Sequence, residues 1–401
     1  MTTTRWPLVR LEEVVAEALP GFAVGERDPH GVVQLRMNNV DTQGHLNWSD
    51  YVRVPATSGM ISKYRLLSGD VVFNNTNSTA LVGKSARFAG YAEPVVYSNH
   101  FTRLRPVPDR LDSAYLAAWL LRLWQQHTFE DLCNRWIGQS AVNREKLLAL
   151  EIPLPSVSVQ RRIVAKLDEQ MSALDRAKQA LAEQQRAACL LTAAVLQHVF
   201  SGPKSSSWLS ARLVTVGTFD AGGTPAKDQQ SYWADTGYPF VTGADITSTT
   251  VGARNARAHL TQAGLDSGKT AVCPAGTVLV VTRTRVGRIG VAGETVAASQ
   301  DITAFTCHHN LLPAYVMWYL RKESGHLIAQ SRGATIQGLR RSVLENLNIP
   351  VPPVPEQKQL IETVEQATHN AALLQEDITH RLATVASMRT ALLDAAFFGE
   401  I

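Results

Sequence analysis

The stretch Ile152-Pro-Leu-Pro155 occurs a second time as Ile349-Pro-Val-Pro352, 197 residues further along the chain. The same offset aligns five further pairs: Gln160 with Gln357, Ile163 with Leu360, Ala194-Val195 with Ala391-Leu392, Phe200 with Phe397, and Gly202 with Gly399. No insertion or deletion separates the two copies over about fifty residues. An internal repeat constrains the architecture more strongly than any single element does. Two copies predict a two-fold pseudo-repeat rather than a solenoid.

Each Pro-rich stretch is followed by about forty residues that contain no glycine or proline. Apolar residues recur at every seventh position in both segments, which is typical of a coiled-coil seam. Forty helical residues span about 60 Å. Two unrelated helices on separate cores are the alternative, but the matching phase and length favour two helices that pack antiparallel, with a globular part at either end. The predicted coiled-coil and subunit-docking positions are Leu167, Leu174, Leu181, Leu191, Val195, Val364, Leu374, Ile378, Val385 and Leu392.

The composition is that of an ordinary globular protein with two or three domains. The chain has 401 residues, of which 45% are hydrophobic and 18% are charged, and these values exclude a disordered chain. Its four cysteines lie far apart without a C-x-x-C spacing, so neither a disulfide framework nor a zinc site is expected. A reducing, cytoplasmic location fits this cysteine usage. The first seven residues lack the apolar core of a signal peptide, and no apolar run is long enough to span a membrane.

The charge is unevenly distributed along the chain, although the net charge is only +4. Residues 202–348 carry 14 basic and 9 acidic residues, whereas residues 349–401 carry 3 basic and 7 acidic residues. Residues 1–150 carry 16 basic and 14 acidic residues, so the segments before both long helices are basic, whereas the last helix is acidic. This distribution is compatible with globular parts that bind nucleic acid and with helices that bind a protein.

The segments that precede the long helices also resemble each other, although more loosely. Trp6-x-x-x-Arg10-Leu11 returns as Trp208-x-x-x-Arg212-Leu213, and the turn and strand at 69–73 return at 276–280. Short strands precede helices in both halves, which predicts an α+β fold. The offset drifts between 197 and 207, so insertions and deletions are confined to these segments. The predicted domains are a first globular head at 1–150, a long helix at 151–202, a second head at 203–348 and a second long helix at 349–401.

The motifs expected of an enzyme are missing from this sequence. Ser78-x-x-x-x-Gly83-Lys84-Ser85 resembles a phosphate-binding loop but lacks the first glycine. The glycines at 287, 290 and 293 have the wrong spacing for a dinucleotide-binding loop and indicate a tight turn. No Asp/Asn-Pro-Pro-aromatic tetrapeptide of amino-methyltransferases occurs. His308-His309 follows Cys307 without further spaced ligands, so no metal site is predicted. We therefore expect that the chain performs no catalysis itself.

Taken in order, the repeated motifs resemble the specificity subunit of a Type I restriction-modification system. The resemblance covers nearly the whole chain, because both Pro-rich stretches, both long helices and the openings of both heads contribute to it. It extends to Gly222-Gly-Thr-Pro225 and to Pro274-Ala-Gly276-Thr-Val, which resemble parts of that family's target-recognition domains. One departure is Val159, which stands where the second copy has Glu356. It removes a favourable charge from a helix start and puts little of the resemblance in doubt.

This resemblance implies a division of labour between heads and helices. Each head reads one half of a bipartite site on double-stranded DNA in the major groove, and the antiparallel helices set the unread gap. Different heads imply an asymmetric site. The helices also dock two modification subunits, which carry S-adenosylmethionine and methylate adenine N6, and restriction subunits can join them. No cofactor is expected in this chain.

Base reading requires Arg or Lys for guanine and Asn or Gln for adenine, presented from loops or helix ends. Any single residue of this kind can also be an ordinary solvated turn residue, and we expect this of about half of the candidates. The triplet of arginines between 283 and 288 is the strongest prediction. In the first head the base-reading candidates are Asn74, Asn75, Asn77, Lys84, Ser98, Asn99 and His100; in the second they are Thr282, Arg283, Arg285, Arg288, Gln300, Asp301 and Gln337. Phosphate contacts, which position DNA without specifying its sequence, are predicted for Arg87, Arg257, Lys269 and Arg332.

Two other functions compete with DNA reading. A coiled-coil scaffold with two protein-binding heads predicts no salt-dependent affinity for DNA, whereas a DNA reader loses affinity steeply as salt is added. An enzyme with a duplicated catalytic domain is disfavoured, because no set of acid, base and nucleophile recurs in both halves. The sequence therefore favours DNA reading.

Overall fold

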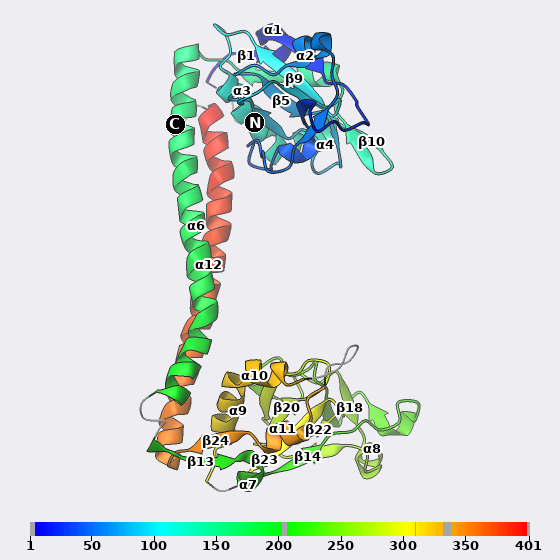
Figure 1. Ribbon diagram of the computed structural model, residues 1–401, viewed down its shortest axis with the longest axis vertical. Helices are drawn as coiled ribbons and strands as arrows, with labels where there is room; N and C mark the ends of the chain where they lie inside the picture. Colours follow the sequence, from blue (N-terminus) through cyan, green and yellow to red (C-terminus); the bar gives the residue numbers. More distant parts are fainter. Residues whose placement is uncertain (1–4, 203–206, 309, 332–337, 399–401) are drawn as a thin grey trace. The chain divides into compact units, whose positions relative to one another are not determined.

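The computed structural model describes residues 5–202, 207–308, 310–331 and 338–398 (Figure 1). The chain forms two compact units. Unit 1 comprises Met1–Ala182 and His380–Ile401, and unit 2 comprises Glu183–Thr379. Each unit contains one α+β head and a part of both long helices, which confirms the predicted fold class. None of the helices among the described residues is long and apolar enough to cross a membrane.

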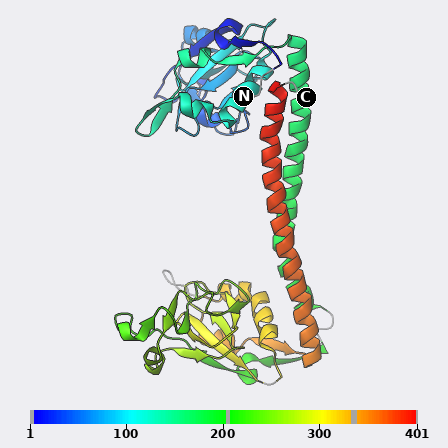
Figure 2. The ribbon, with the colours of Figure 1, turned by 180° about the vertical axis from the view of Figure 1, so that it is seen from behind.

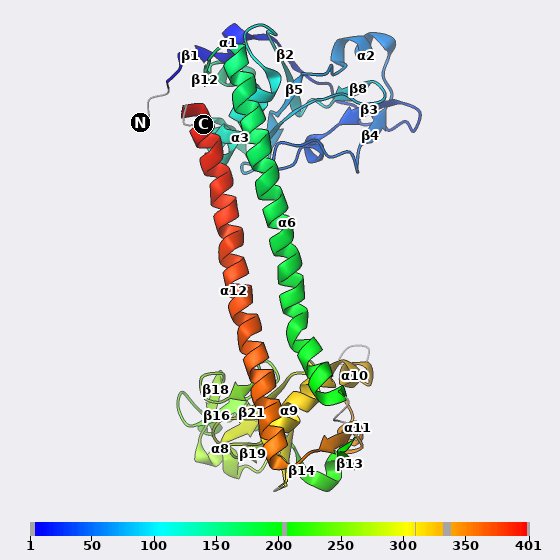
Figure 3. The ribbon, with the colours of Figure 1, turned by 90° about the vertical axis from the view of Figure 1, so that its left-hand side faces the viewer.

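The two long helices are α6 (Val157–Ser201) and α12 (Val354–Phe398), each of 45 residues. In unit 1 the beginning of α6 packs with the end of α12, since Ile163 and Phe397 share one hydrophobic core (Figure 1, Figure 3). In unit 2 the end of α6 packs with the beginning of α12, where Phe200 and Val364 share a core. The helices therefore run antiparallel, as the matching heptads predict.

Most of the predicted seam residues are covered. Leu167, Leu181, Val364 and Ile378 are buried, whereas Leu174, Val195, Val385 and Leu392 are half-buried. Leu191 and Leu374 instead remain 38% and 40% exposed. The apolar repeat thus forms the contact between the helices, and these two leucines lie outside it.

Head 1, from β1 to β12, is built on two small sheets. The first has the order β2 (Val15–Pro20), β9 (Phe101–Pro106), β5 (Val71–Asn74) and β7 (Ser85–Arg87), and the second has the order β4 (Val52–Val54), β3 (Val32–Leu35) and β8 (Val95–Tyr97). Strands β3 and β8 are parallel, and the strands of the first sheet are antiparallel. The remaining elements are β1 (Leu8–Arg10), α1 (Leu11–Val14), the 3-10 helix η1 (Met37–Asn39), α2 (Ser58–Tyr64), β6 (Thr76–Asn77), α3 (Ser113–Gln125), α4 (Thr128–Leu132), β10 (Asn134–Trp136), β11 (Gln139–Ala141), α5 (Arg144–Leu148) and β12 (Glu151–Pro153).

Head 2, from β13 to β24, repeats this plan with additional edge strands. Its first sheet has the order β14 (Gly217–Ala221), β23 (Ile302–Cys307), β20 (Val278–Val281), β21 (Ile289–Ala292) and β17 (Thr250–Val251). Its second sheet has the order β15 (Trp233–Ala234), β18 (Ala258–Leu260), β16 (Tyr238–Val241), β22 (Val296–Ala298) and β19 (Ala271–Cys273). The remaining elements are α7 (Leu213–Val216), the 3-10 helix η3 (Gln230–Tyr232), α8 (Gln262–Asp266), α9 (Pro313–Lys322), α10 (Ser324–Ala329), α11 (Arg341–Glu345), β13 (Leu209–Arg212) and β24 (Asn348–Val351).

The two glutamines that follow the repeated Pro-rich stretches have the same role in both units. Both Gln160 and Gln357 are fully buried in the first turns of the long helices. The Gln160 amide accepts a hydrogen bond from the backbone N–H of Asp112 at 2.8 Å and donates to the carbonyl oxygens of Arg110 and Pro155 at 3.0 and 2.8 Å. Gln357 makes the same three bonds to Leu312, Asn310 and Pro352, at 2.9, 2.7 and 2.8 Å. Each glutamine thereby ties a long helix to the start of a helix of its head, which is α3 in head 1 and α9 in head 2.

Aromatic residues complete this junction between head and helices. The Tyr115 hydroxyl donates to the Pro153 carbonyl oxygen at 2.8 Å, and the Tyr315 hydroxyl donates to that of Pro350 at 2.9 Å. The end of the opposite long helix covers each tyrosine, with ring centroids 4.9 Å apart for Phe397 and Tyr115 and 5.3 Å apart for Phe200 and Tyr315. The repeated Phe is therefore the residue with which each helix end docks on a head.

Candidate nucleic-acid interface

Three strand ends meet at one edge of head 1. Strand β3 ends beside the turn between β8 and β9, because the Ser98 backbone N–H donates to the Leu35 carbonyl oxygen at 3.0 Å. Strand β5 ends beside the same turn, because the Asn75 N–H donates to the His100 carbonyl oxygen at 3.0 Å. We call residues 36–39, 74–77 and 98–100 the tip of head 1.

Head 2 has a corresponding edge that is held by the same bonds. The Ser299 N–H donates to the Val241 carbonyl oxygen at 2.9 Å, and the Thr282 N–H donates to the Asp301 carbonyl oxygen at 2.8 Å. Residues 242–245, 281–288 and 299–301 form the tip of head 2. Most of the candidate residues of both heads therefore lie at the two tips, although they are spread over the sequence.

The asparagines that leave β5 are largely engaged within head 1. The fully buried Asn74 donates to the His100 carbonyl oxygen at 2.9 Å, and Asn77 donates to the Asn74 side chain at 2.6 Å. Asn75 donates to the Thr102 hydroxyl at 3.0 Å. These amides hold the loop in shape, so they are poorly placed to bind a base as well.

Asn99 is exposed and His100 is half-buried at the same tip. Ser98 lies beneath them and is only 5% exposed, and its hydroxyl has no hydrogen-bond partner among the described residues. Buried polar atoms are normally paired, so this hydroxyl is available to a ligand or a water molecule. Among the candidates at this tip, these three are therefore the best placed to face a partner.

Two basic candidates of head 1 lie away from the tip. The Lys84 amine is buried and donates to the carbonyl oxygens of Val40 and Met37, and burial lowers the pKa of this amine despite the nearby Asp41. The Arg87 Nε donates to the Ser113 hydroxyl at 2.9 Å, beside α3. Lys84 therefore supports the fold internally, and Arg87 belongs to the junction with the helices.

The arginine loop of head 2 is exposed and strained. Arg283 and Arg285 are exposed, while Arg288 is half-buried and donates to the Ala244 carbonyl oxygen at 3.4 Å. Between the first two, Thr284 has a φ of 63°, a left-handed value that β-branched residues rarely adopt. Such strain is concentrated at functional loops, because the surrounding structure must maintain it. The strain gives the arginine prediction support that the sequence alone could not provide.

The other candidates of head 2 have varied surroundings. Thr282 is buried and its hydroxyl lies 3.1 Å from that of Thr303, whereas Gln300 is exposed and accepts a hydrogen bond from Thr224. Asp301 is half-buried, Lys269 is exposed, and the Arg257 Nε lies 3.2 Å from the buried Asp245 carboxylate. Arg332 and Gln337 lie outside the described residues.

Sequence reasoning missed several residues of the head 1 tip. Arg36 and Asn38 follow β3 and line a hollow of about 540 Å³, together with Ser98, Asn99 and His100. The exposed Arg27 lines it as well. The signal that could have found them is a basic and amide-rich segment, Arg36-Met-Asn-Asn39, directly after a β-branched strand. It has no constant-offset copy in the second half, so the repeat did not reveal it.

A β-hairpin lies next to the tip of head 1 and was not predicted. Strands β10 and β11 pair with each other, and Ser140 of β11 pairs with Asn77 of β6. The hairpin projects from the body of head 1 (Figure 1, Figure 2). Trp136 is 60% exposed and Ile137 is fully exposed at its turn. Two large apolar side chains are therefore presented to solvent beside the candidate interface.

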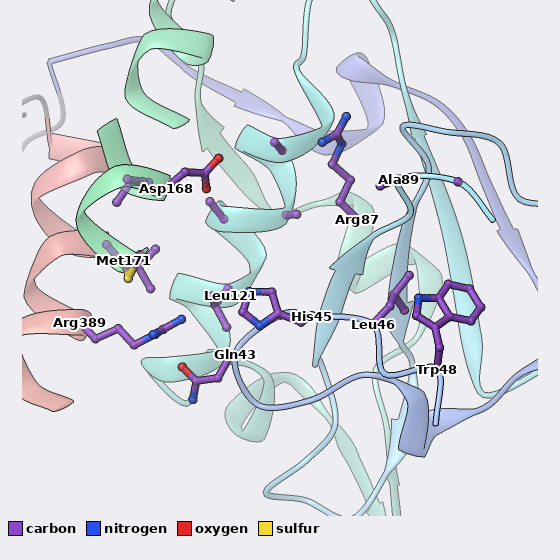
Figure 4. Close-up of a pocket in the computed structure, with 17 residues that line it drawn as sticks. Gln43, His45, Leu46, Trp48, Arg87, Ala89, Leu121, Asp168, Met171 and Arg389 are labelled. Atoms are coloured by element: carbon purple, nitrogen blue, oxygen red, sulfur yellow. The ribbon is translucent and has the colours of Figure 1, made fainter. Parts of the chain in front are cut away.

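A separate pocket of about 470 Å³ lies between head 1 and the helices within unit 1. Figure 4 shows Asp168 and Met171 on α6, Arg389 on α12, and His45 and Arg87 on head 1 around it. Burial raises the pKa of the Asp168 carboxyl, and Arg87 and His45 counteract this. The pocket lies at the junction, and Arg87 is the only DNA-binding candidate among its lining residues. No group of three or more His, Cys, Asp or Glu side chains within the described ranges is arranged to hold a metal ion.

Two stretches of the chain, residues 38–186 and 206–382, match the family model of the Type I restriction modification DNA specificity domain. A protein of Methanocaldococcus jannaschii, assigned as the MjaX type I restriction enzyme specificity subunit, is 23% identical over 321 residues, which cover 75% of this chain and 72% of that protein. The EcoR124I/EcoR124II specificity subunit of Escherichia coli is 22% identical over 271 residues, which cover 63% of this chain and 62% of that subunit. The crystal structure of the HsdS subunit from Thermoanaerobacter tengcongensis has the same fold, with a TM-score of 0.68, 24% identity, and coverage of 99% of this chain and 97% of that one.

Proposed function

Because the chain belongs to the Type I restriction modification DNA specificity family, and is thus the DNA specificity subunit of such a system, we propose that its two heads read the two halves of a bipartite, asymmetric DNA site. The observation that carries this proposal is the pair of matched tips. The same backbone hydrogen bonds hold both tips, yet the side chains on them differ. An asymmetric bipartite site has two different halves, so it requires two heads with the same backbone arrangement and different exposed side chains.

The specificity subunit is the non-catalytic component of the system, and the cofactor lies in its partner subunits. We propose two modification subunits as partners, which bind S-adenosylmethionine and methylate adenine N6, with restriction subunits joining them. The number two is proposed because the helix-and-head unit is duplicated, which allows one partner for each copy. We propose that this assembly works in the cytoplasm, because the cell's DNA is accessible there and a reducing medium suits the four free cysteines.

Exposed leucines on the long helices support a docking role. In unit 2, Leu190 and Leu191 of α6 are 67% and 38% exposed, and Leu373 and Leu374 of α12 are 52% and 40% exposed. The Gln375 amide donates to the Cys189 sulfur at 3.5 Å, so the two leucine pairs lie at the same level of the helix pair. A cluster of exposed apolar side chains at one level indicates a protein-binding surface.

Salt dependence separates the proposal from the scaffold alternative. The complex of this chain with its modification subunits is titrated with a pool of random duplexes at increasing salt concentration. A DNA reader loses roughly 10³-fold or more in affinity between 50 and 200 mM salt, because phosphate contacts release counterions. A scaffold with two protein-binding heads adds no affinity to that of the modification subunits alone at any salt concentration, and that result would reject the proposal.

A further inference from the structure

The two tips can be aligned residue by residue from their hydrogen bonds. The Gly21 N–H donates to the Phe101 carbonyl oxygen and the Gly222 N–H donates to that of Ile302, both at 3.0 Å. A Cβ at Gly21 would lie 2.4 Å from the Ser98 carbonyl oxygen, and one at Gly222 would lie 2.0 Å from that of Ser299. Only glycine allows this close approach. The turns at 98–100 and 299–301 are therefore structurally equivalent.

The segments that leave β3 and β16 are equivalent for the same kind of reason. The Arg36 N–H donates to the Asn39 side chain at 2.8 Å, and the Thr242 N–H donates to the Asp245 side chain at 2.9 Å. In both segments the residue that caps the turn is buried, so the residues before it are held in a fixed position. Arg36 thus corresponds to Thr242.

The equivalent positions carry different chemistry. Head 1 has a guanidinium where head 2 has the Thr242 hydroxyl, and it has the Asn38 amide where head 2 has Ala244. Asn99 corresponds to Gln300 and His100 to Asp301. Ser98 and Ser299, which lie under the turns, are the same residue. The frame is therefore constant, and the groups presented at its surface vary.

Arg36 is the residue of the head 1 tip that is best suited to bind a base. It is half-buried at the wall of the hollow, and its guanidinium makes no hydrogen bond or ion pair with any residue that the structure describes. The Arg36 guanidinium lines the same hollow as the buried, unpartnered Ser98 hydroxyl, so a ligand in this hollow that supplies acceptors can bind the guanidinium. The O6 and N7 atoms of guanine are two adjacent acceptors that match the spacing of a guanidinium.

We propose that Arg36 reads a guanine in the half-site of head 1, and that Thr242 is the position in head 2 that corresponds to it. The proposal rests on the proposed function, because it presupposes that the tips face DNA. It makes the base at one position of each half-site depend on one residue of each head. Asn99, which is exposed on the neighbouring turn, is then the adenine reader of the head 1 half-site.

The test is to map the methylated motif made by the full complex with the Arg36→Ala and Arg36→Lys variants. Arg36→Ala is expected to lower the preference for guanine at one position of one half-site by roughly 10- to 100-fold, the value of one bidentate contact. Arg36→Lys keeps the charge but lacks the planar fork, so it retains affinity and still loses part of that preference. Arg144→Ala, which removes an exposed arginine at the start of α5 in the same head, is the matched control and leaves the motif unchanged.

A reciprocal substitution in head 2 makes the test stricter. Thr242→Arg places a guanidinium at the equivalent position of head 2 and is expected to introduce a guanine preference in the other half-site alone. An unchanged motif with Arg36→Ala overturns the proposal, and so does a uniform loss of affinity without a change of motif, since that result makes Arg36 a phosphate contact. If the unmodified chain yields no bipartite motif, the proposed function fails first, so the two failures are distinguishable.

Discussion

The junctions between head and helices are nearly identical in the two units, whereas the tips of the heads differ. At the junctions, Gln160 and Gln357 make the same three hydrogen bonds, and Phe397 and Phe200 cover equivalent tyrosines. At the tips, the backbone hydrogen bonds are the same, but Arg36 of head 1 corresponds to Thr242 of head 2, and Asn38 corresponds to Ala244. Buried contacts tolerate little change because each partner constrains the others. Exposed groups on a fixed frame can change without cost to folding.

The largest losses of stability should follow from removing the phenyl ring that covers the tyrosine at each junction. Phe397→Ala is expected to cost about 4 kcal/mol of local stability in unit 1, because it leaves a cavity beside Tyr115. Phe200→Ala should cost a similar amount beside Tyr315 in unit 2. Amide hydrogen exchange of the full chain measures both, and each variant should accelerate exchange in α3 or α9 respectively but not in the other helix. Equal acceleration in both helices would contradict two separate junctions.

The buried glutamines should have the next largest effect. Gln160→Ala removes one acceptor and two donors, and leaves the Asp112 N–H without a partner, at a cost of about 3 kcal/mol. Gln357→Ala should cost the same within the error of hydrogen exchange at the start of α12. Gln184→Ala, at an exposed position on α6, is the control and should have no measurable effect. A much smaller cost in one unit would show that the repeated motif is not used in the same way twice.

One ion pair distinguishes the two junctions. The Arg122 Nε lies 2.7 Å from the Asp394 carboxylate, and Gln126 donates to the same oxygen. The positions that correspond to Arg122 and Asp394 in unit 2 are Lys322 and Gln197, which bind Glu323 and Ser201 instead. Asp394→Ala is therefore expected to destabilise unit 1 by about 1.5 kcal/mol, because Arg122 is buried and would lose its counter-charge. Gln197→Ala should change unit 2 by less than about 0.5 kcal/mol, and a larger change would remove the distinction.

Substitutions at the tips of the heads should have the smallest effect on stability. Arg285→Ala is expected to change the stability of unit 2 by less than about 0.5 kcal/mol, because the side chain is exposed. The same variant should weaken specific DNA binding by the complex by about tenfold, a loss that a single base contact can cause. Unchanged affinity together with an unchanged methylation motif would reject the role of Arg285.

The sequence predicted the long helices and the junctions because their residues recur at one constant offset. Gln160 and Phe200 could be paired with their copies without any structure, and burial requires such residues to be kept in register. The antiparallel packing followed from the same repeat. Leu191 and Leu374 were assigned to the seam because they lie at a heptad position, but each is exposed, since the apolar repeat at that position is interrupted by polar residues.

The tips were predictable only in part. Residue type suggested Asn74 and Lys84 as DNA contacts, but a sequence does not show that Asn74 donates inward to the His100 carbonyl oxygen or that the Lys84 amine is buried. Arg36 was missed because its equivalent is Thr242, a residue of different chemistry at a different offset. Hydrogen bonds across strands align the two tips, and such bonds are invisible in a sequence whose loops differ in length.

The most direct test of the central claim is to map N6-methyladenine across the genome of cells that carry the neighbouring modification gene, with and without this chain. Matched junctions with different tips predict one bipartite motif with two different halves and a fixed unread gap, and this motif should disappear when the chain is removed. If a stable, methylation-competent complex forms and no motif depends on the chain, the heads do not read DNA and the account is wrong.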